Sequence, residues 1–169
     1  MTDILLRDKN GEHTILKSKS FDKEKLLHDA LEESPSLLSL EEHVEDVEMV
    51  PIGREVSVSS GSADMLYLDN QGVLNLVEVK LDSNREVRRN VVGQILEYAS
   101  QMINWSYSDV EDRFASYKGS DGSKLFSYFT EETGGVAEEE SEFKDLVENN
   151  LQDGQIRLVV AVNNMVKPL

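Results

Sequence analysis

The chain has 169 residues, which is enough for one domain with a sizeable core. It carries 33 acidic and 17 basic side chains, a formal net charge of −16. This charge argues against a protein that coats DNA nonspecifically, but it does not exclude a local basic groove. It contains no cysteine, which excludes disulfides, thiolate catalysis and cysteine zinc sites and fits a reducing cytoplasm, where we expect the protein.

The first half of the sequence predicts a hairpin, a helix and three strands. Asn10-Gly11 is typical of a tight hairpin turn within residues 1–20. A helix follows in SFDKEKLLHDALEESPSLLSL, with Ser20 or Asp22 as its cap, and Ser34-Pro35 ends it. Three strand-like runs come next: VEMVPIGREVSVSS, SADMLYLD and GVLNLVEVK. The apolar stripe of the helix consists of Leu26, Leu27, Ala30 and Leu31.

The second half predicts a long helix, an acidic helical segment and a last strand. The long helix is SNREVRRNVVGQILEYASQMINW, capped by Ser83 or Asn84. The acidic segment is helical in pieces, broken at KGSDG and TGG, and QIRLVVAV reads as a further buried strand. The buried face of the long helix consists of Val87, Val91, Ile95, Tyr98 and Met102.

The order of these elements predicts an α/β fold. Its mixed β-sheet is an antiparallel meander plus a crossover strand, flanked by helices. We interpret residues 1–169 as a single domain whose core is 21–105 plus the strand at 155–162. Residues 1–20 form an N-terminal hairpin and residues 106–154 an acidic helical insertion. Because NNMVKPL directly follows a strand with an apolar pattern, we expect the chain to be the N-terminal part of a longer protein.

The second hairpin of the meander brings two acids together. A three-residue loop at 70–72, with Gly72 in the left-handed position, sets the register of its strands. In this register Asp64 lies opposite Glu78, and Lys80 lies one step further on the same face. The same register pairs Asp69 with Val73, Leu68 with Leu74 and Leu66 with Leu76.

Two opposed carboxylates need a compensating positive charge. Lys80 could supply it as an ion pair, and so could a divalent cation. Mg²⁺ prefers oxygen ligands, which the carboxylates of Asp64 and Glu78 and the carbonyl of Val79 would offer. Lys80 would then lie beside the metal and orient or deprotonate a water, the latter only if its pKa is lowered.

These residues resemble the motif of a known nuclease family. Asp64 followed by Glu78-Val79-Lys80 resembles the PD-(D/E)xK superfamily, which has the restriction-endonuclease-like fold. Ala63 stands where the motif has its proline, which is a departure from the pattern. The helix before the meander resembles the family's glutamate-bearing helix, with Glu24 as the first match and Glu32 or Glu33 as weaker ones.

A second family feature lies on the long helix. Gln94 and Tyr98 match a Gln-x-x-x-Tyr pattern, and Gln94 falls inside the apolar stripe, where an amide needs a partner. A catalytic residue or the nucleic-acid backbone would supply that partner, and so would the main chain. We expect Tyr98 to serve packing rather than chemistry.

The resemblance implies a metal-dependent nuclease, a (deoxy)ribonuclease that hydrolyses phosphodiester bonds, with DNA as the expected partner. It implies Mg²⁺ or Mn²⁺ as cofactor, held by Asp64, Glu78 and Val79. Its implied catalytic residues are Asp64, Glu78, Lys80, Gln94 and Glu24.

Plainer interpretations of the same residues stay open. Lys80 would be an ion-pair partner of Glu78, and Glu24 an acid facing the helix dipole. His28, one turn from Glu24, is the histidine that could approach the site.

Other functions and partners also stay open. The chain would then be a non-catalytic nucleic-acid- or protein-binding module on the same fold, or a structural protein whose hairpin acids are incidental. A homodimer and a missing C-terminal domain stay open as partners. We expect no membrane partner, because no run is long and apolar enough to span a bilayer.

Overall fold

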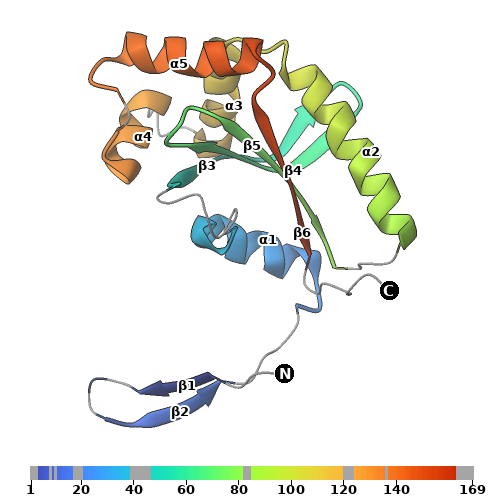
Figure 1. The fold of residues 1–169 in the computed structure, drawn as a ribbon, viewed down its shortest axis with the longest axis vertical. Coiled ribbons are helices and arrows are strands. Elements are labelled where there is room, and N and C mark those ends of the chain that lie inside the picture. Colours follow the sequence, from blue (N-terminus) through green and yellow to red (C-terminus); the bar gives the residue numbers. More distant parts are fainter. Residues whose placement is uncertain are drawn as a thin grey trace.

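The fold is α/β, as a computed structural model of the chain shows (Figure 1). The structure describes residues 4–7, 9, 11–16, 21–38, 47–81, 85–119, 124–135 and 137–162, without the side chains of 4–6, 16 and 85–88. Its strands are β1 (Ile4–Arg7), β2 (His13–Leu16), β3 (Met49–Val58), β4 (Gly61–Asp69), β5 (Leu74–Lys80) and β6 (Ile156–Val162). Its helices are α1 (Glu24–Glu33), the 3-10 turn η1 (Pro35–Leu37), α2 (Arg85–Met102), α3 (Tyr107–Lys118), α4 (Leu125–Thr133) and α5 (Glu140–Gln152).

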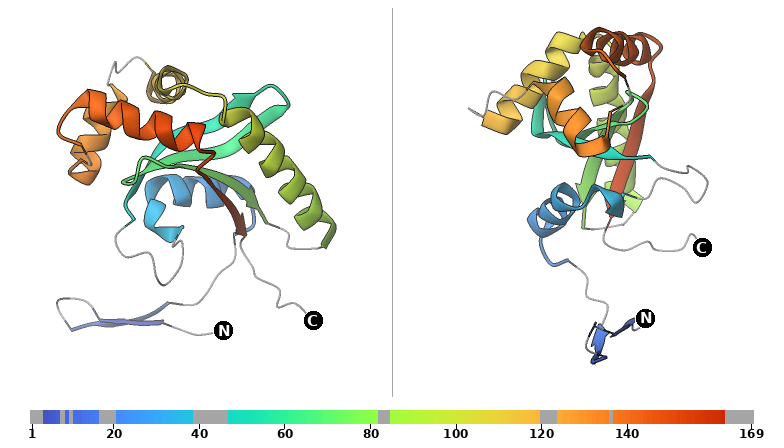
Figure 2. Two further views of the ribbon diagram at one scale, coloured as in Figure 1. Left: turned by 45° about the horizontal axis from the view of Figure 1, so that its top comes forward. Right: turned by 90° about the vertical axis from the view of Figure 1, so that its left-hand side faces the viewer.

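The main sheet confirms the predicted mixed topology. Its four strands lie in the order β3-β4-β5-β6, with antiparallel β3–β4 and β4–β5 pairs and a parallel β5–β6 pair. Residues of α2, α3, α4 and α5 bury one face, which we call the α2 side. Residues of α1 bury the other face, the α1 side, so the sheet is the middle of three layers (Figure 2). Strands β1 and β2 form a separate antiparallel pair, as expected for the first hairpin.

The β4–β5 hairpin follows the predicted register. Leu66 pairs with Leu76 and Leu68 with Leu74, and the main-chain nitrogen of Asp69 donates to the carbonyl of Val73. Gly72 has a φ of 71°, which a side chain would strain. A Cβ there would also lie 2.7 Å from the Cγ of Leu146 on α5, so both the backbone conformation and the close packing favour glycine at this position.

A buried carboxylate fastens this hairpin to β6. Asp69 is fully buried and accepts hydrogen bonds from the main-chain nitrogens of Gln71 and Val73, each within 3.0 Å. Its other oxygen accepts from Asn75 at 2.9 Å and from the guanidinium of Arg157 on β6. The charge of Asp69 is therefore fully paired, and its network joins residues far apart in the sequence.

Helix α1 differs from the prediction at its start and in its stripe. It begins at Glu24 after Lys23, and no side chain caps it, so Asp22 is not the cap, while Ser20 lies outside the described residues. Leu26 is 45% exposed, so its place in the predicted stripe is wrong. The buried residues Leu27, His28 and Leu31 instead follow the i, i+1, i+4 spacing of one helix face.

Helix α2 buries the predicted face. Val91, Ile95, Tyr98 and Met102 are all at most 6% exposed, whereas the side chain of Val87 and the predicted caps lie outside what the structure describes. None of the described helices is both long and apolar enough to cross a lipid bilayer.

The acidic segment at 106–154 forms α3, α4 and α5. The helices break near Gly119 and Gly134, within the two predicted breaks. The segment also places three fully buried rings, Phe114, Phe129 and Phe143, in the core on the α2 side. The charged residues of these helices therefore lie on their outer faces, while their inner faces form part of the core.

Strand β6 is an edge strand, and the expectation that it is buried is wrong. Leu158 is 36% and Val160 37% exposed. Within the described part of the chain, β6 pairs with β5 alone, so its far edge has no neighbouring strand there. An apolar sequence pattern does not distinguish a central strand from an edge strand.

Candidate active site

The predicted acids meet where β4 and β5 separate. The β4–β5 ladder ends at the pair Met65–Val77, one step before Asp64 and Glu78. The predicted direct pairing of Asp64 with Glu78 is therefore absent from the ladder. Instead, the Oδ2 atom of Asp64 accepts the main-chain N–H of Val79 at 2.8 Å. A carboxylate here replaces a strand carbonyl, because continuing the ladder would bond Val79 to residue 63.

Glu78 is the acid with the least room to ionise. Its side chain is fully buried, and its Oε1 atom has no hydrogen-bond partner among the residues that the structure describes. Burial raises the pKa of Glu78, the nearby Asp64 carboxylate raises it further, and Lys80 offsets part of this, so that the pKa rises to about 7. A buried, partly unpaired carboxylate that is protonated near neutral pH is a common feature of functional sites.

Lys80 forms an ion pair with each of the two acids. Its Nζ atom lies 3.5 Å from Oε2 of Glu78 and 3.6 Å from Oδ2 of Asp64. Burial acts to lower the pKa of Lys80, but attraction to Asp64, Glu78 and Glu24 outweighs it, so the pKa lies above its usual value. Lys80 is thus a cation here, which supports the ion-pair interpretation and does not provide the lowered pKa that a general base needs.

Helix α1 contributes two residues to the same place. The Oε1 atom of Glu24 accepts the main-chain N–H of Leu81 at 3.4 Å, and its charge acts on Lys80. The Nε2 atom of the buried His28 lies 3.7 Å from Oδ2 of Asp64. The sequence names His28, one turn after Glu24, as the histidine that could approach the site, and it does lie there, although the expected catalytic and metal-binding residues did not include it.

Glu32, a weaker match to the family glutamate, lies elsewhere. It accepts hydrogen bonds from Arg54 at 2.5 Å and from the hydroxyl of Tyr117 at 2.7 Å. It therefore ties α1 to β3 and α3. The structure brings Glu24, rather than Glu32, to the predicted acids.

Gln94 has a partner within its own helix. Its Nε2 atom donates to the hydroxyl of Tyr98 at 3.0 Å. That hydroxyl lies 2.5 Å from where a Cβ of Gly61 would stand, so Tyr98 packs against the β3–β4 turn. No bond of Gln94 to the acids is found among the described residues, and its catalytic role stays a prediction.

The residues present fit a divalent cation in part. Glu78 offers an unpaired buried oxygen, and Asp64 lies beside it. The N–H and C=O of one strand residue point to the same edge, so the carbonyl of Val79 is directed toward Asp64. Among the described residues there is no ready cluster of three or more His, Asp or Glu side chains for a metal. This ligand set suits Mg²⁺, which keeps several waters and is commonly held by one or two carboxylates.

The comparisons with known proteins add little. No family model and no curated protein matches the chain. Among solved structures, the chain is similar to a protein in a complex of EndoMS with double-stranded DNA, at 10% identity and a TM-score of 0.33. The similarity covers 90% of this chain and 52% of that one, so the chain spans about half the length of the structure it matches. At these values the likeness carries no argument about function.

Proposed function

We propose that the protein is a metal-dependent nuclease that hydrolyses phosphodiester bonds, with DNA as the substrate. The observation that carries the proposal is Glu78, a fully buried carboxylate beside Asp64 and Lys80, one oxygen of which has no partner in the described part of the chain. A structural role alone would leave the Oε1 atom of Glu78 buried without a hydrogen bond, which is costly. DNA as the substrate and a cytoplasmic location follow from the sequence and its family resemblance.

A Mg²⁺ or Mn²⁺ ion held by Asp64, Glu78 and the Val79 carbonyl would supply charge stabilisation at the reacting phosphate. The chain's own residues do the rest. The N–H of Val79 holds the Asp64 carboxylate in place at 2.8 Å. Lys80, as a cation between the two acids, is placed to hold a phosphate oxygen or to orient a water. The negative charge of Glu24 raises the pKa of Lys80 and so helps to keep Lys80 protonated.

The direct test is cleavage of labelled DNA. Single-stranded, duplex and branched DNA and a matched RNA are incubated with the protein in 5–10 mM Mg²⁺ or Mn²⁺, amounts on the order of those at which carboxylate sites fill. We expect cleavage that EDTA abolishes and that Glu78→Gln lowers by at least about a hundredfold. Glu97→Gln, an exposed glutamate on α2, is the matched control and should cleave like wild type. Cleavage by Glu78→Gln at the wild-type rate would refute the proposal.

One observation favours a second function, a non-catalytic binding module on the same fold. Lys80 already forms ion pairs with Asp64 and Glu78 without any metal. In that case DNA or a protein would bind without cleavage, and Glu78→Gln would leave binding unchanged. Binding of the same DNA, measured by fluorescence anisotropy in EDTA and in Mg²⁺, separates this function from the nuclease.

A further inference from the structure

At one position along β3 and β4, the alternation of side chains between the two faces of the sheet is interrupted in both strands, which we call the face exchange. Gly53 pairs with Leu66 on the α2 side, and Val56 pairs with Ala63 on the same side. Between them, Arg54 pairs with Met65 on the α1 side, where Arg54 bonds Asp29 and Glu32 of α1. Regular alternation would put the next pair, Glu55 and Asp64, on the α2 side. Val56 and Ala63 occupy that side instead.

Glu55 has the backbone conformation that makes this exchange. Its φ is 50°, and it is the one non-glycine residue with a positive φ among those that the structure describes. The pairs before and after it keep one register, so neither strand gains a residue there. Both strands therefore turn together at Glu55 and Asp64. A left-handed residue that is not glycine is strained, and such strain is often kept at functional sites.

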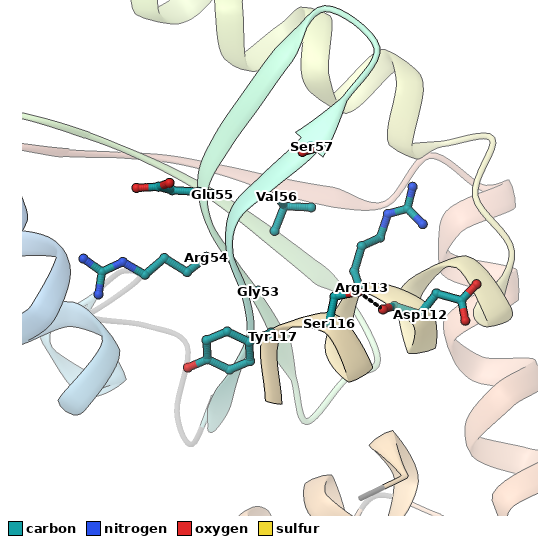
Figure 3. A pocket seen from close by; sticks show the side chains of 9 residues that line it. All are labelled: Gly53, Arg54, Glu55, Val56, Ser57, Asp112, Arg113, Ser116 and Tyr117. Atoms are coloured by element: carbon teal, nitrogen blue, oxygen red, sulfur yellow. Dashed lines mark hydrogen bonds between the residues drawn. The ribbon is translucent and has the colours of Figure 1, made fainter. Parts of the chain in front are cut away.

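Neighbouring side chains agree with this description. Arg54 and Glu55, although consecutive in a strand, point to the same side, and Val56 points to the other (Figure 3). A Cβ on Gly53 would lie 2.4 Å from Cγ2 of Val56, so residue 53 must be glycine for Val56 to take this face. The pocket between β3 and α3 that Gly53, Glu55 and Tyr117 line, about 310 Å³ in volume, lies beside the turn.

The turn decides where the Asp64 carboxylate goes. On a regular strand, Val79 would exchange hydrogen bonds with the main chain of residue 63. With the strands turned, Oδ2 of Asp64 takes the N–H of Val79 and lies near His28 and Lys80. We propose that Glu55 is a positioning residue, whose left-handed backbone places the Asp64 carboxylate in the fork between β4 and β5.

This placement can be measured without metal or substrate. The exchange rate of the Val79 amide, followed by NMR in EDTA, reports its bond to Asp64. The Val77 amide on the same strand lies within the ladder and serves as the internal reference. Asp64→Ala is the positive control and should speed Val79 exchange about tenfold or more relative to Val77, the loss expected for a bond to a charged group.

Two substitutions of Glu55 separate its backbone from its carboxylate. Glycine adopts a positive φ freely, whereas β-branched valine resists it. We expect Glu55→Gly to keep Val79 protected and to raise Tm by about 2–4 °C through relief of strain. We expect Glu55→Val to speed Val79 exchange like Asp64→Ala. Ser57→Val, at an exposed position two residues on, controls for valine itself and should leave Val79 protected.

The outcomes of the Val79 exchange experiment are distinct from those of the DNA-cleavage assay. Only the catalytic role of the Asp64 placement rests on the proposed function. Protection of Val79 in Glu55→Val would overturn the inference. Loss of protection in both Glu55→Gly and Glu55→Val would overturn it too, because the carboxylate rather than the backbone would then matter. Should Glu55→Val not fold, Glu55→Ala takes its place with the same expected direction. A wild-type protein that cleaves no DNA would refute the nuclease and leave the Val79 measurement valid.

Discussion

The Asp64 carboxylate and the main-chain nitrogen of Val79 form a hydrogen bond of 2.8 Å that joins β4 to β5 after their ladder has ended. This bond orients an acid through the backbone, which cannot rotate away as a second side chain could. The predicted ligand carbonyl belongs to the same residue, Val79. The fold itself therefore fixes the position of the Asp64 carboxylate, which would lower the entropy lost if a ligand binds there.

Divalent metal should stabilise the protein through this pair of acids. At a concentration a hundredfold above its Kd, a ligand of the native state adds about 2.7 kcal/mol. For a chain of this size that is roughly 5–10 °C in Tm. We expect a thermal melt in Mg²⁺ or Mn²⁺ to show a rise for wild type and none for Glu78→Ala. An equal rise in both proteins would place the metal elsewhere.

Stability in EDTA should fall as the pH rises from about 4.5 to about 7. The raised pKa of Glu78, about 7, means that the native state binds its proton more tightly than the unfolded chain does. The stabilisation is complete below the unfolded pKa and is lost as the pH rises through the folded one. Its size is on the order of 3 kcal/mol, at about 1.4 kcal/mol for each pH unit between the two pKa values. Urea unfolding of wild type and Glu78→Gln across this range measures it, and parallel curves for the two would contradict it.

The two glutamates of α1 should behave differently. Glu24→Gln removes a charge at the exposed edge of the site, so we expect the free energy of unfolding to change by no more than about 0.5 kcal/mol, while DNA cleavage slows. Glu32→Gln weakens the pairing of Arg54 and the bond to Tyr117, and should cost about 1–3 kcal/mol with cleavage retained. Melts and cleavage assays on both variants test this, and the reversed pattern would make Glu32 the functional acid.

Asp69 should be the costliest acid to remove for stability alone. Asp69→Ala leaves Arg157 and Asn75 without their buried partner, and we expect a loss of about 3–5 kcal/mol. Asp145→Ala, an exposed acid on α5, is the control and should lie within about 0.5 kcal/mol of wild type. Urea unfolding gives both values. A small loss at Asp69 would mean that water replaces the network.

The parts of the fold that local rules determine could be predicted from the sequence. The left-handed Gly72 and the alternating leucines fix the β4–β5 register, and the apolar spacing of α2 predicts its buried face. For the site, the sequence predicts which residues lie near one another. Asp64, Glu78, Lys80 and Glu24 do come together, because strand register and element order place them.

The missing parts depend on tertiary contacts that no local pattern carries. The face exchange at Glu55 is visible in the paired strands and leaves no mark in the alternation of either sequence. The exposure of Leu26 and of β6 depends on which neighbours exist in space. The pKa of Lys80 depends on three acids from separate elements. The motif alone therefore could not show whether Lys80 has the lowered pKa that a general base needs.

The parallel pairing of β5 with β6 also has a consequence for folding. Asn75 and Arg157 are 82 positions apart, and the helices between them supply the aromatic part of the core on the α2 side. A contact of this range must wait for a long loop to close, and such topologies fold in milliseconds to seconds rather than microseconds. During that interval the half-built sheet would expose the apolar edge of β5. Docking of the last strand covers that edge of β5 and makes β6, with its exposed Leu158 and Val160, the outer strand of the described sheet.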